Sequence, residues 1–552
     1  MLLNRRTLLL SASLAAAPLP AWARNLARGA FTHGVASGDP TADSVILWTR
    51  FAPEGRDNRI AWELADDENF TQISKRGHAE AEASSDYCVK VDVRGLAAGR
   101  KYFYRFLSAS GPSVTGRTLT APSEGDTQLT IALFSCSNKP FGYFHAYADA
   151  AADESIDLAV HVGDYIYEYP RGDYPGDDDA VPGRVIEPAN EIVALNDYNQ
   201  RYASYHLDPD LLELRRLKPL CVVWDDHEIT NDTTRTGAQN HQVATEGTWE
   251  DRVAAATKAY FDWMPIRRPE RRGVRLYRQL DWGNLARIVL LDTRLIGRDR
   301  QLDYRNTIAP VVMSGGDIPA AIAAFRQQLD DPNRTLLGAE QESWFAQTLA
   351  QSKARGQAWQ IVAQQIVMQD TAIPAGVSPF VDPNLPAMAR QYVMMGQMAS
   401  SVGLPINLDA WAGYPVARAR FLQACAANAA NAVVLGGDSH NCWVGNLRAP
   451  DDAARVAALE FAGGSVTSPG LERVLSAGQP GQAEAVVVAA NRDMTYCDLA
   501  KRGYAKLRFT RQACDAEWRT VSDIRAAERG PVAATRFNAA AGASGPQAWT
   551  MA

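Results

Sequence analysis

Five short apolar segments, each followed directly by a polar cluster, constrain the fold of this chain more than any other feature of its sequence. The segments span residues 129–134, 158–162, 221–224, 361–363 and 432–435. Runs of this kind are typical of strands buried on both faces of a sheet, and helical stretches such as 336–355 between them favour a layered α/β fold. Because ligands bind beyond the carboxyl ends of the strands in such folds, the five polar clusters are expected to form one shared site.

The chain before residue 122 has a different pattern. Residues 44–49 form a β-branched and aromatic run, and segments 87–93 and 101–106 alternate apolar and polar residues on either side of a turn. Short strands at this spacing predict a small β-sandwich, like a fibronectin type III module. We expect an N-terminal sandwich over 30–121, a catalytic domain over 126–525 and a C-terminal tail over 526–552.

The first 23 residues have the features of an export signal. Arg5 and Arg6 precede an apolar run that begins at Leu8, prolines end this run, and an Ala-Trp-Ala sequence at 21–23 resembles a cleavage site. This pattern predicts a twin-arginine signal peptide, and an ordinary secretory signal with two arginines is the alternative. The apolar run is shorter than the roughly 20 residues that span a bilayer. We therefore expect a periplasmic or secreted protein, exported by the twin-arginine (Tat) machinery, with no membrane span.

Composition narrows the class of ligand. The formal net charge of −7 gives no general attraction for nucleic acid, so no stable nucleic-acid complex is expected. Positive charge for a phosphate compound would have to be local, and bound metal ions are a natural source. The seven cysteines leave at least one thiol unpaired, and Cys497 and Cys514 are the pair most suited to a disulfide. The sequence leaves the oligomeric state open.

The cluster after residue 162 contains two oxygen ligands. Asp164 and Tyr167 are three residues apart, which on one helical turn would direct both side chains to the same point. Carboxylate and phenolate oxygens suit a trivalent ion such as Fe³⁺. The alternative is that Asp164 only caps the next helix.

Two other clusters contain acids and histidines. Asp225, Asp226 and Glu228 surround His227 after a buried strand, where they would repel one another unless a cation neutralises them; a solvated charge run is the alternative. In the segment 436–441, one residue separates an aspartate from a histidine, so both can face one centre, although a turn with a buried, hydrogen-bonded histidine fits as well. Cys136, taken alone, is as well explained as a small buried residue.

The order of these motifs resembles the PhoD-like alkaline phosphatase and phosphodiesterase family, part of the metallophosphoesterase superfamily and related to purple acid phosphatases. The matching stretches are FTHGVASGDP from Phe31, LFSCSNKP from Leu133, HVGDYIYEY from His161, VWDDHEITND from Val223, LLDTR from Leu290, AWAGYPVAR from Ala410, LGGDSHNCW from Leu435 and EFAGGSVTSPG from Glu460. They extend over nearly the whole chain. The resemblance implies layered β-sheets flanked by helices, of the metallophosphoesterase type, behind the N-terminal sandwich.

The resemblance also implies two kinds of metal, Fe³⁺ and Ca²⁺. The expected Fe³⁺ ligands are Cys136, Asp164, Tyr167 and His440. Asp164 would bridge to a second metal, for which Ca²⁺ is the family-like choice, and its other expected ligands are Asp226 and Asp438. Asn231 and Asp232 would help to hold an additional Ca²⁺. Gln365 stands where the superfamily often has another second-metal ligand, and a glutamine there is a departure from that pattern.

The activity that the resemblance implies is hydrolysis of phosphomonoesters, phosphodiesters or both. A metal-bound oxygen would attack phosphorus in line, and a metal or a proton from His227 would stabilise the leaving group. Asn138 and Asn441 are the expected phosphate contacts. Two alternatives remain: a phospholipase D-like diesterase, and a non-catalytic exported binding protein without metals. The presence of the whole predicted ligand set argues against the second.

Overall fold

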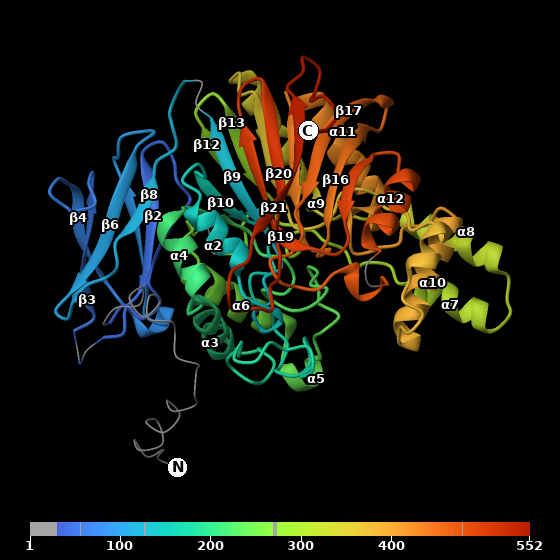
Figure 1. Ribbon diagram of the computed structural model, residues 1–552, viewed down its shortest axis with the longest axis horizontal. Helices are drawn as coiled ribbons and strands as arrows, with labels where there is room; N and C mark the ends of the chain where they lie inside the picture. The colour runs from blue at the N-terminus through green and yellow to red at the C-terminus, as the bar shows by residue number, and fades with distance from the viewer. Residues whose placement is uncertain (1–29, 54, 56, 126–127, 269–272, 477–478) are drawn as a thin grey trace, which may run out of the picture.

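The computed structural model describes residues 30–552 except 54, 56, 126–127, 269–272 and 477–478 (Figure 1). The predicted signal peptide, residues 1–23, lies outside the described residues. Within the described ranges, no helix combines the length and the apolar character that crossing a membrane requires.

Two β-sheets form the centre of the molecule (Figure 1). The ten-stranded sheet has the order β22-β21-β20-β19-β9-β10-β11-β1-β2-β5, and the seven-stranded sheet has the order β12-β13-β14-β15-β17-β16-β18. The first contains β1 (Val35–Gly38), β2 (Ser44–Arg50), β5 (Cys88–Arg94), β9 (Leu129–Phe134), β10 (Leu158–His161), β11 (Leu220–Val222), β19 (Arg502–Phe509), β20 (Ala513–Val521), β21 (Val532–Ala540) and β22 (Thr550–Met551). The second contains β12 (Arg278–Trp282), β13 (Ala286–Leu290), β14 (Trp359–Ala363), β15 (Ala432–Gly436), β16 (Cys442–Ala449), β17 (Asp452–Ala462) and β18 (Met494–Asp498).

The five apolar segments of the sequence lie in these two sheets rather than in one. The strands β9, β10 and β11 run parallel in the ten-stranded sheet, and β14 and β15 run parallel in the seven-stranded sheet. Alternate residues of β14 face opposite ways: Ile361 packs into the core between the sheets, whereas Val362 packs against helices. Burial on both faces explains why these strands are continuously apolar.

Helices cover the outer faces of both sheets. The helices α9 (Gly338–Ala354) and α11 (Pro415–Asn428) pack on the seven-stranded sheet. On the other side, α2 (His145–Ala152), α3 (Leu195–His206), α4 (Pro209–Leu217) and α6 (Trp249–Trp263) share the large core with the ten-stranded sheet. The remaining helices are α5 (Val243–Glu246), α7 (Tyr304–Met313), α8 (Ile318–Leu329), α10 (Ala387–Ser401) and α12 (Pro480–Ala490). The molecule is therefore a four-layer α/β/β/α structure, the layered α/β class that the sequence predicts.

The N-terminal part is a β-sandwich that shares a sheet with the rest of the molecule. Its outer sheet contains β3 (Arg59–Ala65), β4 (Ile73–Glu80), β6 (Lys101–Ser108), β7 (Gly111–Pro112) and β8 (Gly116–Leu119), and it packs on β2 and β5 through a separate core. The strand β1 also pairs with β11 at Gly38 and Leu220. A Cβ at Gly38 would lie 2.5 Å from the Leu220 carbonyl oxygen, so this close approach requires glycine.

Residues 526–552, expected to form a tail, instead add strands to the ten-stranded sheet. The strand β21 pairs with β20 from Ala513↔Ala540 to Val521↔Val532, and Phe537 on β21 is buried. The alanine-rich sequence of β21 has few β-branched residues, so tertiary pairing rather than local propensity forms this strand.

The predicted Cys497–Cys514 disulfide is wrong. All seven cysteines are buried and free. Cys497 lies on β18 of the seven-stranded sheet, whereas Cys514 lies on β20 of the ten-stranded sheet. Proximity in the sequence is therefore not proximity in the fold.

Candidate metal centre

Loops at the carboxyl ends of β9, β10, β11 and β15 bring most of the predicted ligands together between the two sheets. Five ligand-bearing or neighbouring residues in these loops have left-handed backbone conformations, with φ between 54° and 64°: Cys136, Asp164, Asp232, Asp438 and His440. This conformation costs a non-glycine residue roughly 1–2 kcal/mol. Such strain persists where the surrounding structure enforces it, and it collects at functional sites.

The first group of donors consists of Cys136, Asp164 and His440. Their ligand atoms all lie within 4.8 Å of one another. The Tyr167 hydroxyl donates to Asp164 Oδ2 at 3.0 Å and lies 3.4 Å from His440 Nε2. Asp164 and Tyr167 therefore meet as predicted, but they do so in an irregular loop and not on a helical turn.

A backbone contact fixes the orientation of His440. Its Nδ1 lies 2.8 Å from the carbonyl oxygen of Pro469, so Nδ1 carries the proton and donates it to that oxygen. Nε2, which makes no contact with that carbonyl, points towards Asp164 Oδ2, 3.8 Å away. Histidine ligands of metals are commonly held in this way by the second ring nitrogen.

The protonation of this group points to a cation. Burial raises the pKa of the Cys136 thiol and of the Tyr167 hydroxyl well above their ordinary values, and the carboxylate of Asp164 raises both further. Asp164 Oδ1 is buried without a hydrogen-bond partner. A bound cation reverses this balance, because it stabilises thiolate and phenolate and accepts the free carboxylate lone pair. The residues thus fit a metal ion.

Two further groups of donors extend the site. Asp164, Asp226 and His227 form the second group, and Asp225, Asp226 and Asp438 form the third. Asp164 belongs to the first and second groups, and Asp226 belongs to the second and third. Oδ1 of Asp226 is buried and makes no hydrogen bond, and among the described residues its one close cation is Arg294 Nη2, 3.3 Å away. The arrangement can hold adjacent cations that share a carboxylate.

His227 lies beside these acids and is held by a carboxylate. Its Nδ1 is 2.7 Å from Glu168 Oε2, and its ring centroid is 4.4 Å from that of Tyr167. Burial alone would lower the pKa of His227, but the carboxylates of Glu168, Asp164 and Asp226 outweigh burial and raise the pKa well above 6.5. In the absence of metal the imidazole is therefore protonated and can donate.

The model of the family described as PhoD-like phosphatase matches residues 131–518, and the model of the N-terminal domain of PhoD-like phosphatases matches residues 14–122. This chain belongs to the PhoD-like phosphatase family. Membership makes it an enzyme that hydrolyses phosphoric esters.

Two relatives are similar over most of this PhoD-like phosphatase. Alkaline phosphatase D of Bacillus subtilis (strain 168) is 34% identical over 465 residues, which are 81% of this chain and 71% of the relative. A solved structure described as "Structure of PhoD" is 29% identical, with a TM-score of 0.74 over 94% of this chain and 92% of that chain. The α/β fold of the present chain agrees with that structure.

The predicted phosphate contacts of this PhoD-like phosphatase lie beside the donors. Asn138 and Asn441 are each about 1% exposed. The Asn138 amide donates to the carbonyl oxygen of Tyr174, at 3.3 Å. Asn441 Oδ1 accepts from the backbone N–H of Leu471, while its Nδ2 is buried without a partner. Of the two, Asn441 therefore has the free donor that a phosphate oxygen needs.

Two residues expected near the metals, Gln365 at the second metal and Asn231 at an additional Ca²⁺, make other contacts in the structure. Gln365 uses both ends of its amide: Nε2 donates to the carbonyl oxygens of Trp224 and Leu291, and Oε1 accepts from the N–H and hydroxyl of Thr293. It ties the two sheets together and has no end left for a metal. Asn231 donates from its amide to Gln239 at an exposed position.

Asp232, the neighbour of Asn231, is closer to the donors. Its backbone N–H donates to Asp226 Oδ2 at 2.7 Å. Burial raises the pKa of Asp232 to about 7, and the carboxylates of Asp409 and Asp226 contribute to the shift. A cation bound nearby would stabilise the carboxylate form of Asp232 and so displace its proton.

Arg294 is the principal residue that the sequence interpretation missed. It is fully buried and forms ion pairs with four aspartates: Asp225, Asp226 at 3.3 Å, Asp438 at 3.2 Å and Asp409 at 2.9 Å. It follows β13 in the LLDTR stretch, so an arginine directly after a buried strand was the available signal. Its guanidinium contacts the same carboxylates that a second metal would use.

Proposed function

We propose that this protein is an exported, metal-dependent phosphoesterase that hydrolyses phosphomonoesters, phosphodiesters or both. One observation carries the proposal: three donor groups share Asp164 and Asp226 between them at one buried site. Carboxylates this close repel one another unless cations lie between them. The phospholipase D-like alternative has no support among the relatives described above.

The donor chemistry suggests which ions bind. Cys136, Asp164, Tyr167 and His440 offer thiolate, carboxylate, phenolate and imidazole, a set with enough negative charge for Fe³⁺. Asp164, Asp226 and Asp438 offer only carboxylate oxygens, which suit Ca²⁺. Bound ions of this kind polarise a phosphoryl oxygen and lower the pKa of bound water.

The protein groups would orient the ester and move a proton. Asn441 has a free Nδ2–H group for a phosphoryl oxygen, and Asn138 follows Cys136 of the first donor group by two residues. Glu168 holds Nδ1 of His227, which leaves Nε2 to donate a proton to the departing oxygen. Water adds to phosphorus as the bond to that oxygen breaks, so the products are an alcohol and a phosphate.

Metal content and colour test the proposal. The purified protein, expressed with iron and calcium, is analysed for metals and assayed with p-nitrophenyl phosphate and bis-p-nitrophenyl phosphate, with and without a chelator. We expect chelator-sensitive hydrolysis and a visible phenolate-to-iron band that Tyr167→Phe removes. Tyr504→Phe is the matched control, because Tyr504 is also fully buried and donates to a carboxylate, that of Asp149.

The outcomes separate the parts of this proposal. If the protein is active and metal-loaded but colourless, the phosphoesterase proposal stands and Fe³⁺ is excluded. A folded protein with no metal and no hydrolysis would contradict the whole proposal and favour a binding protein.

Export is a separate part of the proposal, supported by Arg5 and Arg6 in the first 23 residues. We propose that the Tat machinery exports the protein to the periplasm or the medium. Replacing both arginines with lysine should leave the phosphatase activity in the cytoplasmic fraction. Unchanged export of the double variant would contradict the twin-arginine route.

A further inference from the structure

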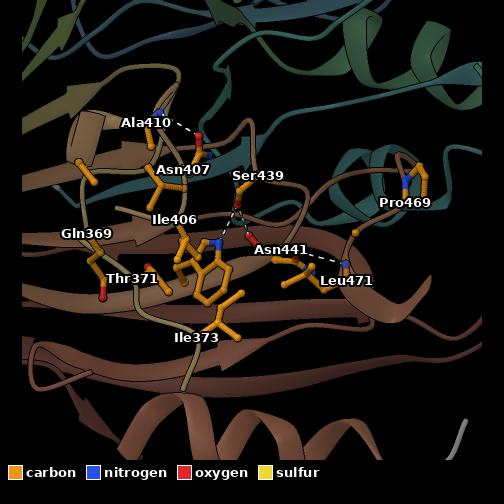
Figure 2. A pocket seen from close by; sticks show the side chains of 14 residues that line it. Gln369, Thr371, Ile373, Ile406, Asn407, Ala410, Ser439, Asn441, Pro469 and Leu471 are labelled. Carbon is orange, nitrogen blue, oxygen red and sulfur yellow. Dashed lines mark hydrogen bonds between the residues drawn. The ribbon is translucent and has the colours of Figure 1, made fainter. Parts of the chain in front are cut away.

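The structure contains a pocket of about 320 Å³ (Figure 2). Its apolar lining comes from four parts of the chain: the loop after β14, the segment 406–412, the strand β16 and the segment 469–471. The apolar side chains are Val367, Ile373, Ile406, Ala410, Ala412, Trp443, Pro469 and Leu471. Pockets that bind organic ligands are commonly about 300–1,000 Å³ and have mainly apolar walls.

The pocket shares residues with the metal centre. Ser439 and Asn441 line it, and they flank His440 of the first donor group. Pro469 also lines it, and the carbonyl oxygen of Pro469 accepts from His440 Nδ1. On the opposite wall, Ala410 follows Asp409, which pairs with Arg294. Pocket and metal centre therefore meet at the loops that hold the ligands.

The side-chain amide of Asn441 lies where the pocket meets the metal centre, and its N–H group makes no hydrogen bond. Asn441 is 1% exposed, its Oδ1 accepts from Leu471 N–H, and its Nδ2 has no partner (Figure 2). A buried N–H group without a partner costs about 1–3 kcal/mol. A phosphoryl or ester oxygen of a ligand would supply the missing acceptor.

The pocket lining disfavours charged substituents. None of the lining residues in the described part of the chain carries a charge. Burying a charged sugar or peptide group there would cost several kcal/mol without a partner. An apolar group gains by leaving water in proportion to the area it buries.

We propose that this pocket binds an uncharged aromatic or branched apolar substituent of the phosphoester substrate, while Asn441 contacts the phosphoryl group at its mouth. This inference rests on the proposed function and narrows it to a class of ester. Simple methyl or glycerol esters would leave the pocket unfilled, whereas aryl esters would bury their ring against Trp443 and Ile406.

Phosphonates test this inference without turnover, because they cannot be hydrolysed. Calorimetry measures the Kd of methylphosphonate and phenylphosphonate for the metal-loaded protein. We expect phenylphosphonate to bind tighter by at least about tenfold, since the ring buries apolar area that the methyl group lacks. Ile406→Trp, which fills the pocket, should reduce the ratio of the two Kd values to nearly one.

Two more variants keep the test decisive. Ile318→Trp makes the same change on α8, where Ile318 is 38% exposed and does not line the pocket, and should keep the wild-type ratio. If Ile406→Trp does not fold, Ile373→Ala serves instead, because it enlarges the pocket. The ratio of the Kd for phenylphosphonate to the Kd for 1-naphthylphosphonate should then be larger in the variant than in the wild type.

Hydrolysis of p-nitrophenyl methyl phosphate, measured in parallel, separates failure of the pocket inference from failure of the proposed function. Hydrolysis with equal Kd values for the two phosphonates would overturn the pocket and leave the phosphoesterase intact. No hydrolysis and no binding of methylphosphonate would overturn the proposed function and the pocket with it.

Discussion

Residues of the metal centre are held in conformations that the local sequence does not favour. Of the nine non-glycine residues with positive φ in the described ranges, five lie at this centre. The surrounding contacts hold them there, as the bond from His440 to Pro469 illustrates. The packing of the two sheets supplies the free energy that offsets this backbone strain. The ligand side chains are therefore in position before any ion binds.

Arg294 is the clearest case of a single residue that compensates the negative charge of the metal centre. Arg294→Ala would leave Asp225, Asp226 and Asp438 without their buried counter-ion. We expect the metal-free variant to lose about 3–5 kcal/mol of unfolding free energy, because unpaired buried charges are costly. Urea unfolding in chelator measures the loss, and excess Ca²⁺ should restore part of it.

A surface arginine is the control for Arg294→Ala. The side chain of Arg536 is 62% exposed and pairs with Glu517, so Arg536→Ala should cost no more than about 1 kcal/mol. Equal losses in the two variants would contradict the balancing role of Arg294.

Lys139 should make stability rise with pH. Its pKa is lowered to about 7, mainly by burial; Arg184 and Arg201 add to the lowering, while Asp208 and Glu187 oppose it. Because the unfolded chain binds the proton up to about pH 10.5, folding costs most below pH 7 and this cost falls as pH rises from 7 to 10.5. At about 1.4 kcal/mol per pKa unit, the full cost is about 5 kcal/mol.

Lys139→Met tests this by removing the charge. The gain in unfolding free energy over the wild type should be largest near pH 6, should shrink as pH rises towards 10.5, and should vanish above about pH 11. Lys139→Gln keeps a donor for the carbonyl oxygen of Ser204, which Lys139 Nζ contacts at 2.7 Å, and should show the same pH dependence. A gain that does not vary with pH would rule out this account of Lys139.

Among the elements, the loops after β10 and β11 are joined by one side chain. Glu228 accepts from the backbone N–H groups of Asp164, Tyr165 and Asp225. Glu228→Ala would leave three buried donors without partners, at about 1–3 kcal/mol for each. We therefore expect a loss of at least about 3 kcal/mol in unfolding free energy and weaker metal retention on dialysis.

Glu213→Ala is the control for Glu228→Ala, because Glu213 pairs with Arg216 at a partly exposed position. It should lower the unfolding free energy by less than about 1 kcal/mol and leave metal content unchanged. Normal metal content in Glu228→Ala would show that the two loops hold their positions without this carboxylate.

At the scale of the whole molecule, Asp39 joins the N-terminal sandwich to the layers behind it. Its side chain is nearly fully buried; it accepts from Arg278 Nη2 at 2.8 Å and from the backbone N–H of Arg267 at 2.9 Å. Arg278 also donates to the carbonyl oxygen of Val222 on β11. A shared sheet and this buried pair should make the two parts unfold together.

Asp39→Ala should separate them. We expect calorimetry to show one unfolding transition for the wild type and two for the variant, with about 3–5 kcal/mol lost from the first. Asp43→Ala, at an exposed position beside Thr41, should keep the single transition. A single transition in Asp39→Ala would mean that the β1–β11 pairing alone couples the two parts.

The sequence alone indicated the fold class, the family resemblance and most of the donor set. Apolar runs that end in polar clusters indicate strands and their carboxyl ends because burial on both faces removes alternation. Cys136, Asp164, Asp226, Asp438 and His440 all follow such strands, and the structure brings them together. Local chemistry was sufficient for these residues, since a buried cluster of acids already implies a cation.

Only the tertiary structure decided which residues share the site in space. The strands β9 to β11 and β14 to β15 belong to different sheets, so Gln365 and Arg294 reach the centre from the second sheet, one as a bridge and the other as a counter-ion. The strand β21 and the absence of the Cys497–Cys514 disulfide likewise depend on sheet pairing. Long-range pairing leaves little trace in local periodicity, because its energy comes from residues far away in the chain.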